Sequence, residues 1–246
     1  MKPLLIVRTG RAPDVISRRH GDFPRWFQLG LRLRTPHVRL VDVENGDSLP
    51  APASCAGAVI TGSASMVTER LAWSERTAGW IRDAMDAELP MLGVCYGHQL
   101  MSHALGGRVD YLPGGREMGT VPLTVHRHAA DDALAAGLPT TFHAHTTHEQ
   151  SVLDLPPGAV SLASSRRDPN HLVRYGRHAI SMQFHPEFSA EVMRAYIRRR
   201  HDVLDAEGLA PADLLAAVVP TPEATRLLRG FVREHLRAPR GETSAA

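Results

Sequence analysis

Lysine, cysteine and long hydrophobic runs are scarce in this 246-residue sequence, and each scarcity excludes a class of protein. Lys2 is the only lysine, so the formal net charge of +2 comes from arginines scattered among 26 acidic residues. The densest basic run, 198–200, ends a predicted helix and has no interleaved aromatic residues, which favours a solvated helix end over a nucleic-acid site. No run reaches the ~18 apolar residues of a membrane span, so we expect no membrane insertion.

Only two cysteines occur, Cys55 and Cys95, too few for a disulfide framework and typical of a reducing compartment. The short apolar run at 4–7 is followed by Arg8 and has no cleavage site of a secretory signal. We therefore expect a cytoplasmic protein. Its 43% hydrophobic and 22% charged residues are ordinary for a globular chain, which at this length can bury one substantial core.

The first half of the chain alternates predicted strands and helices. Short apolar runs closed by turn-forming residues predict buried strands, and an alternating run predicts a half-buried one. These predicted strands are 4–7, 37–43, 57–60 and 91–94. Helical periodicity predicts a stretch that breaks near 21–24 and ends about residue 34, then helices at 73–88 and 97–105. This order is typical of parallel βα units.

The pattern changes between residues 108 and 184, where short β-like runs follow one another and antiparallel pairs are expected. These runs are 108–112, 120–125, 140–145, 159–163, 171–175 and 179–184. Three further helices are predicted at 190–201, 211–217 and 222–236, and the end, 237–246, is predicted to fray.

We therefore predict a single α/β domain with a central, mostly parallel sheet, helices on both faces, extra antiparallel strands and a helical C-terminal extension. Residues 1–190 are assigned to the main part and residues 191–246 to the extension of the same domain. The apolar positions of the extension favour core packing or dimerisation. They are Leu214, Leu215, Val218, Val219, Leu227, Leu228 and Phe231.

Cys95 lies between a predicted buried strand and a predicted helix, in the segment LGVCYGHQ at 92–99. This is the form of a nucleophile elbow, in which Gly93 and Gly97 relieve crowding where the strand and the helix approach each other. A helix N-terminus and a histidine partner lower a cysteine pKa from about 8.5 into the range ~3.5 to 7.5. Taken alone, Cys95 is explained equally well as a small buried apolar side chain, and Cys55 is explained that way too.

A catalytic thiol needs a base and a group that orients the base, and the segment QFHPEF at 183–188 offers both. His185 follows the last predicted strand. Glu187 can accept a hydrogen bond from the other imidazole N–H and so fix the tautomer. A surface turn is the alternative explanation, and the position after a buried strand disfavours it.

Three segments in chain order resemble the class I glutamine amidotransferases: a TGS loop at 61–63, GVCYGHQ at 93–99 and QFHPEF at 183–188. The resemblance extends over about residues 4–188. It implies the flavodoxin-like fold of that family and no cofactor or metal. It also implies a small-molecule substrate, glutamine or another γ-glutamyl compound, whose amide is cleaved with release of ammonia.

The resemblance assigns roles to six residues of this sequence. Cys95 attacks the side-chain carboxamide and forms a γ-glutamyl thioester, His185 shuttles protons, and Glu187 orients His185. The backbone amides of Gly62 and Tyr96 form the oxyanion hole. In the same way, Gln99 is expected to help hold the substrate.

Two departures from the family pattern concern the surroundings of this site. Ser63 stands where many members have a second glycine. The segment THEQSV at 147–152 is similar to the family's Ser-His-Gly-Asp-x-Val stretch but differs at Glu149 and Gln150. We expect no catalytic role for His148.

Other functions remain open at this point. Some stand-alone relatives are γ-glutamyl peptidases, in which water resolves the thioester and no ammonia is channelled, whereas others work with a synthetase that is a separate chain. A non-enzymatic binding module is a further alternative. Association into a homodimer is also left open. A remote one is a zinc hydrolase using His143, His145 and His148, whose H-x-H-x-x-H spacing lacks the aspartate expected at Thr147.

Overall fold

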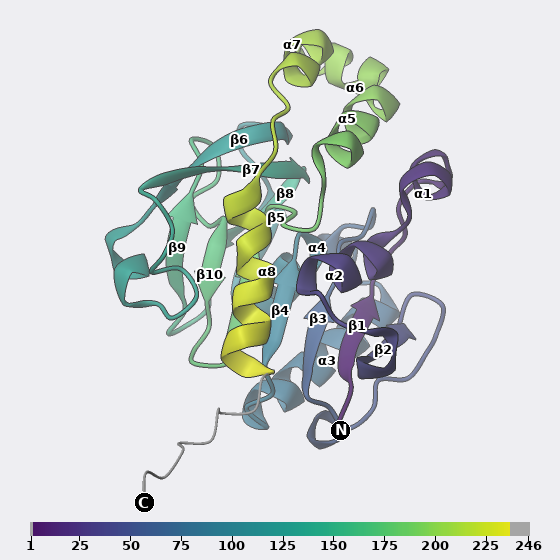
Figure 1. Ribbon diagram of the computed structural model, residues 1–246, viewed down its shortest axis with the longest axis vertical. Helices are drawn as coiled ribbons and strands as arrows, with labels where there is room; N and C mark the ends of the chain where they lie inside the picture. Colours follow the sequence, from purple (N-terminus) through teal and green to yellow (C-terminus); the bar gives the residue numbers. More distant parts are fainter. Residues whose placement is uncertain (1, 237–246) are drawn as a thin grey trace, which may run out of the picture.

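The computed structural model describes residues 2–236, and a large sheet forms its centre (Figure 1). Within these residues the sheet has nine strands in the order β2-β1-β3-β4-β11-β10-β9-β6-β7. The first five are parallel: β2 (Val38–Asp42), β1 (Leu4–Arg8), β3 (Gly57–Ile60), β4 (Met91–Val94) and β11 (Ala179–Met182). The other four are antiparallel: β10 (Leu172–Arg174), β9 (Val160–Ser164), β6 (Glu117–Val125) and β7 (Thr141–His148). The predicted mixed sheet is confirmed.

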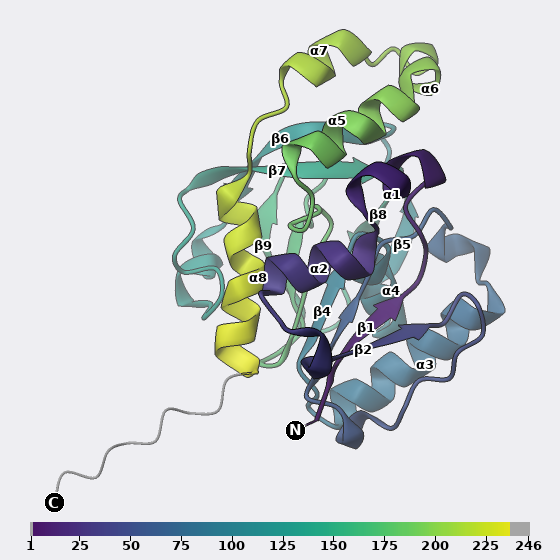
Figure 2. The same cartoon turned by 45° about the vertical axis from the view of Figure 1, so that its right-hand side comes forward.

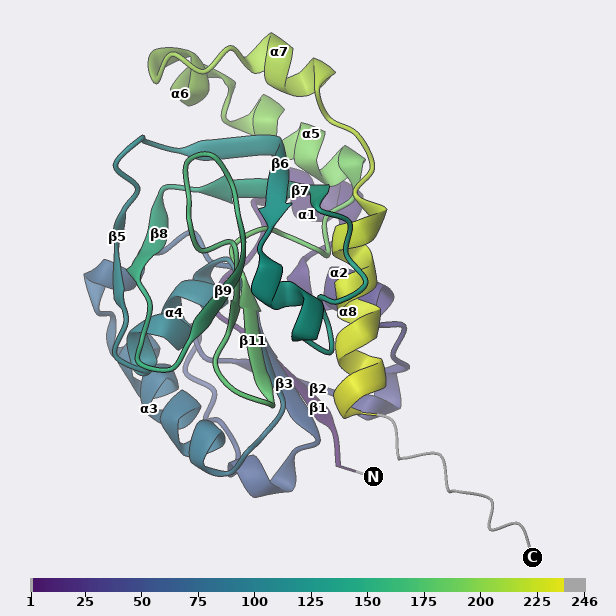
Figure 3. The same cartoon turned by 90° about the vertical axis from the view of Figure 1, so that its left-hand side faces the viewer.

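A separate two-stranded ribbon joins β5 (Arg108–Tyr111) to β8 (Gln150–Asp154), as Figure 3 shows. Sequence analysis missed β8. Its first two residues, Gln150 and Ser151, are polar but buried, so the apolar alternation that marks a strand is absent.

Helices cover both faces of the parallel strands (Figure 2). On one face lie α1 (Asp14–His20), α2 (Phe23–Leu31) and α8 (Pro222–His235), and on the other lie α3 (Ala72–Asp86) and α4 (Tyr96–Ala104). Strand β1 serves both faces, since Leu4 and Ile6 join the core under α2 and α8 while Leu5 and Val7 join the core under α3 and α4. Short 3₁₀ turns occupy Thr35–His37, Pro52–Ser54, Val67–Glu69 and Arg127–Asp131.

The C-terminal helices take two places. α5 (Ala190–Arg199), α6 (His201–Ala206) and α7 (Pro211–Ala216) lie at one end of the molecule beside β6, whereas α8 runs along the sheet (Figure 1). α6 was not predicted, because the helical pattern at 190–201 continues through Arg200, where the backbone leaves helical geometry at φ −103°, ψ 13°.

The apolar side of α8 completes the main core. Leu227, Leu228 and Phe231 are at most 2% exposed, and Leu228 packs so closely against Gly30 of α2 that a Cβ there would overlap it. Core packing therefore accounts for these positions of α8. The boundary between 1–190 and 191–246 stays a prediction, and the predicted frayed end at 237–246 lies outside the described residues. No helix among the described residues is both long and apolar enough to cross a membrane.

Candidate active site

Cys95 occupies the turn between β4 and α4 with an unusual backbone, at φ 53° and ψ −105°. A positive φ is strained for a residue with a side chain and persists only where its surroundings enforce it. The flanking glycines allow the close approach: a Cβ on Gly93 would lie 2.5 Å from the Gly97 carbonyl oxygen, and one on Gly97 would overlap the Ile60 carbonyl. The turn therefore has the geometry expected of a nucleophile elbow, with Cys95 at the carboxyl end of the sheet.

His185 and Glu187 form a buried pair just after β11. His185 Nδ1 donates a hydrogen bond to Glu187 Oε1 at 2.7 Å, and the two side chains are only 2% and 0% exposed. The Phe188 ring stacks on the imidazole with centroids 4.0 Å apart and planes 13° from parallel. This leaves His185 Nε2 without a hydrogen-bond partner among the described residues, and His185 and Cys95 line the same cavity.

The charges of this group favour an ion pair between thiolate and imidazolium. Burial opposes ionisation, but Glu187 and Cys95 together raise the pKa of His185 to about 10. Burial likewise opposes a charged thiol, and the positive charge of His185, with a smaller contribution from His148, holds the pKa of Cys95 below its usual value. The thiolate form of Cys95 is therefore favoured, whereas Cys55, also free and buried, lies before β3 with its thiol against the Ala51 carbonyl.

The surroundings of His148 were not revealed by the sequence, and the expectation that it has no catalytic role stays a prediction. Its Nδ1 lies 2.9 Å from the Gln150 carbonyl oxygen and its Nε2 lies 3.1 Å from Glu117 Oε2, so both nitrogens must donate. Burial opposes the charge, yet Glu117 raises the pKa of His148 above its usual value. A buried imidazolium thus lies beside Cys95. The register of β6 and β7, which sets Glu117 opposite His148, was the signal that a single sequence does not reveal.

The Glu117 carboxylate accepts hydrogen bonds from other side chains besides His148. Its Oε2 also accepts from His171 Nε2 at 2.7 Å, and its Oε1 accepts from Ser165 Oγ at 2.6 Å. Despite burial, the two histidines hold the pKa of this carboxyl far below its usual range. Glu117, His148 and His171 bring their ligand atoms within 4.8 Å of one another, and the hydrogen bonds between them account for that closeness.

The remote alternative of a zinc site at His143, His145 and His148 is contradicted by their positions on β7. The regular pairing of β7 with β6 places His145 opposite Thr120 and His148 opposite Glu117. Side chains alternate along a strand, so His143 and His145 share one face and His148 points to the other. His143 is also exposed, while burial and the charge of His185 lower the pKa of His145 to about 4.

Backbone groups of Gly62 and Tyr96 lie beside the thiol and the imidazole. The Thr61 carbonyl accepts from Gly97 N–H at 3.0 Å and from Thr9 Oγ1 at 2.8 Å, which directs the Gly62 N–H of the same trans peptide the opposite way. A Cβ on Gly62 would lie 3.2 Å from His185 Cε1. Within residues 2–236, neither the Gly62 nor the Tyr96 N–H has a hydrogen-bond acceptor. Both remain available to an oxyanion.

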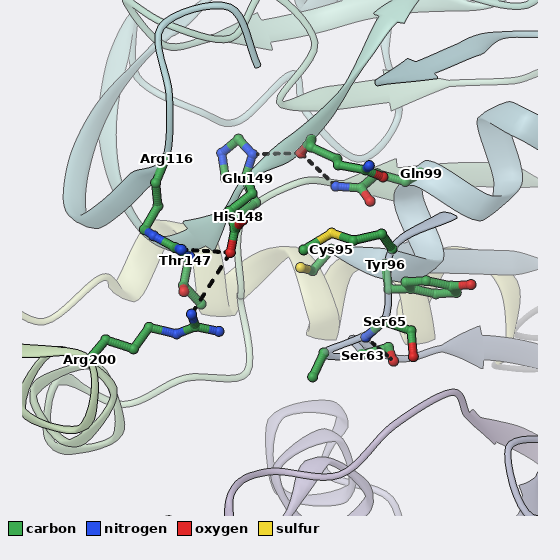
Figure 4. Close-up of a pocket in the computed structure, with 13 residues that line it drawn as sticks. Ser63, Ser65, Cys95, Tyr96, Gln99, Arg116, Thr147, His148, Glu149 and Arg200 are labelled. Carbon is green, nitrogen blue, oxygen red and sulfur yellow. Dashed lines mark hydrogen bonds and ion pairs between the residues drawn. The ribbon is translucent and has the colours of Figure 1, made fainter. Parts of the chain in front are cut away.

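A small cavity opens beside Cys95 on the side of His148 (Figure 4). Arg116 and Arg200 both reach Glu149 there, at 2.6 and 3.9 Å. Gln99 lines the cavity and is anchored, since its Nε2 donates to the Gln150 carbonyl at 2.7 Å and to Gln183 Oε1 at 2.9 Å. The residues lining it are Ser63, Ala64, Ser65, Met66, Cys95, Tyr96, Gln99, Arg116, Thr147, His148, Glu149, Gln150 and Arg200.

Comparison with known proteins gives consistent results. The family model described as Glutamine amidotransferase class-I matches residues 32–202. A GMP synthase (glutamine-hydrolyzing) from Thermomicrobium roseum is 36% identical over 182 residues, covering 73% of this chain and 32% of that protein. Gamma-glutamyl peptidase 5 from Arabidopsis thaliana is 29% identical over 145 residues, covering 58% of each chain. The chain thus matches less than two thirds of the length of either relative.

Two solved structures share the fold. A glutamine amidotransferase from Thermotoga maritima has a TM-score of 0.76 at 20% identity, covering 97% of this chain and 100% of that one. A glutamine amido transferase from Methylobacillus flagellatus has a TM-score of 0.74 at 21% identity, covering 100% and 99% of the two chains. The predicted flavodoxin-like amidotransferase fold is therefore confirmed.

Proposed function

This chain belongs to the class I glutamine amidotransferase family, and we propose that it cleaves a γ-glutamyl amide through a thioester on Cys95. One observation carries the proposal: a cysteine held at positive φ on a strand-to-helix turn shares a cavity with a buried histidine that is hydrogen-bonded to a buried carboxylate. The family match gives the reaction class. The residue roles rest on geometry and charge.

The proposed reaction begins from the thiolate and the imidazolium. Cys95 Sγ attacks the δ-carbonyl carbon, and the N–H groups of Gly62 and Tyr96 hold the oxygen as it becomes negative. The C–N bond then breaks, and His185 Nε2 gives its proton to the departing nitrogen. Water, deprotonated by His185, attacks the thioester and frees glutamate, while Glu187 stabilises the imidazolium that forms again.

We further propose that the small cavity holds the glutamyl group. Glu149 offers one negative charge, and Arg116 and Arg200 offer two positive ones, a set complementary to the ammonium and carboxylate of an amino acid. Gln99 is fixed in the wall of the same cavity. Substrate entry would exchange the ion pair of Arg116 with Glu149 for a pair with the ligand, while Arg116 keeps its ion pair with Glu207 at 2.9 Å.

Two versions of this function differ in what happens to the nitrogen. The similarity to GMP synthases, including a glutamine-hydrolyzing GMP synthase subunit from Methanopyrus kandleri that is 32% identical over 108 residues, favours ammonia release to a separate synthetase subunit. The similarity to gamma-glutamyl peptidase 5 favours hydrolysis without an ammonia acceptor. We propose a cytoplasmic enzyme in either case, on the ground that both cysteines are unpaired. A homodimer stays an untested alternative.

The proposal is tested by incubating the purified chain with glutamine and a panel of γ-glutamyl compounds while ammonia and glutamate are measured. We expect Cys95→Ala and Cys95→Ser to abolish glutamate release. Cys55→Ser is the matched control, because Cys55 is the other free, buried cysteine of the described chain and lines neither cavity beside Cys95. Wild-type turnover in Cys95→Ala would rule out the thioester.

A further inference from the structure

A second cavity meets Cys95 on the side of His185 and is larger, about 270 Å³. The residues lining it are Arg11, Pro13, Phe23, Ser63, Ala64, Cys95, Thr147, His185, Tyr196, Arg199 and Arg200. His185 lines this cavity and not the small one, whereas Tyr96 and Gln99 line the small one and not this one. The two chambers therefore adjoin at Cys95 and also share Ser63, Ala64, Thr147 and Arg200, but they differ in their remaining side chains.

The position of the general acid assigns the two chambers to the two sides of the scissile bond. His185 must reach the departing nitrogen to protonate it, so the leaving group lies on the His185 side of the δ-carbonyl carbon. Ammonia is about the size of water, whose share of liquid volume is about 30 Å³. The chamber on this side has room for a much larger leaving group.

The charge of the second chamber is uniformly positive. Three arginines line it and no acidic residue does. Arg11 pairs with Asp42 at 2.9 Å and Arg200 approaches Glu149 at 3.9 Å. Arg199 has no acidic partner within 4.0 Å among the described residues. Arg199 therefore lies at the chamber wall with no acidic side chain to neutralise its charge, and it is the arginine of this chamber best able to bind an anion.

The rest of the chamber wall combines aromatic and small apolar side chains with the hydroxyl groups of Ser63 and Thr147. The Phe23 ring packs beside His185 with centroids 6.2 Å apart, and the Tyr196 ring stacks on Phe188 at 5.0 Å. Phe23 and Tyr196 are buried, at 4% and 7% exposure, and their positions are fixed by these contacts. A wall that joins fixed aromatic rings to arginine side chains suits a short carbon chain that ends in a carboxylate.

We propose that this chamber is a leaving-group subsite for γ-glutamyl peptides, in which Arg199 binds the carboxylate of the departing amino acid or peptide. The inference rests on the proposed function and specifies its substrate class. In the step concerned the γ-glutamyl C–N bond breaks, the thioester C–S bond remains, and the nitrogen takes the proton of His185 Nε2. The product leaves as a free amine with its carboxylate intact.

The test compares two substrates of nearly equal shape, γ-glutamylglycine and γ-glutamylglycinamide, which differ in whether the leaving group carries a carboxylate. We expect kcat/KM of the wild-type protein to favour γ-glutamylglycine by about tenfold, the effect of one charge-assisted hydrogen bond. Arg199→Gln is expected to bring the ratio close to one. Arg198→Gln is the matched control and keeps the wild-type ratio, because Arg198 is exposed, adjacent in sequence and lines neither cavity.

The outcomes separate this inference from the proposed function. A wild-type ratio near one, in a protein that hydrolyses glutamine, overturns the subsite and leaves the thioester mechanism standing. An equal loss on both substrates in Arg199→Gln also overturns it, since that pattern indicates a structural role. Failure of the wild-type protein to cleave glutamine and both dipeptide substrates would overturn the function and the subsite together.

Discussion

Glu117 accepts a hydrogen bond from His148 across the β6–β7 pair, and that contact keeps a positive charge beside Cys95. The carboxylate is buried and is shared with His171. Because Gln150 also requires a proton on His148, the ring stays an imidazolium for as long as Glu117 is ionised. Glu117, which influences the thiol only through His148, thus lies on β6, whereas His148 lies on β7.

Glu117→Gln should raise the pKa of the Cys95 thiol, because the neutral amide no longer holds the His148 imidazolium. We expect the midpoint of Cys95 alkylation by iodoacetamide to move to higher pH by roughly one pH unit. Ser165→Ala is the control, since it removes a hydrogen bond to Glu117 without changing its charge. An unchanged midpoint in Glu117→Gln, with the fold intact, would show that His148 does not influence the thiol.

Glu187→Gln should impair catalysis while preserving the shape of the buried pair. The amide removes the Glu187 charge, which against burial and together with Cys95 raises the pKa of His185 to about 10, and this pKa is expected to fall toward its usual value. We expect kcat to drop by a factor of about 10² to 10⁴. The pH profile of kcat/KM checks this. A smaller folded fraction alone lowers kcat/KM by the same factor at every pH and leaves the apparent pKa values of the profile unchanged.

Protein stability should decrease as the pH falls below neutrality, partly because of His98. Burial lowers its pKa to about 3, so the folded state keeps the ring neutral while the unfolded chain binds a proton below about pH 6.5. Its contribution is complete above pH 6.5 and is lost as the pH falls toward 3. We expect a loss of about 2 kcal/mol between pH 7 and pH 5.

Urea unfolding of the wild type and of His98→Gln at both pH values isolates this contribution. The variant is expected to be less stable at pH 7, where the Ser181 hydrogen bond at 2.6 Å is altered, but to lose less stability on acidification. Identical pH dependence of the two proteins would exclude His98 as the source.

Gly97→Ala should destabilise the fold strongly, because the new methyl group would overlap the Ile60 carbonyl on the neighbouring strand. Overpacking against a backbone atom costs about 3 kcal/mol or more when the backbone cannot shift. Gly137→Ala serves as control, since a Cβ there meets nothing within 4 Å. The free energy of unfolding is measured for both variants. Similar values would contradict the close approach of α4 and β3.

Most of the fold, and the residues that we propose to be catalytic, could be predicted from the sequence because both are carried by short contiguous segments. The buried strands are apolar runs, and Cys95, His185 and Glu187 follow two of them directly. What the sequence did not reveal depends on pairing across the sheet. β8 is buried but begins with polar residues, and the charge on His148 arises from Glu117, 31 positions away.

The packing of α8 affects when the core of this protein can form during synthesis. Phe231 and Leu228 enter the same core as Ile6, so the last described helix closes a layer that the first strand opens. During synthesis the ribosome releases Ile6 first, and its face stays without that cover until α8 has emerged. A nascent chain that already contains Cys95, His185 and Glu187 then still exposes apolar core surface, and it can complete this core only after α8 has emerged.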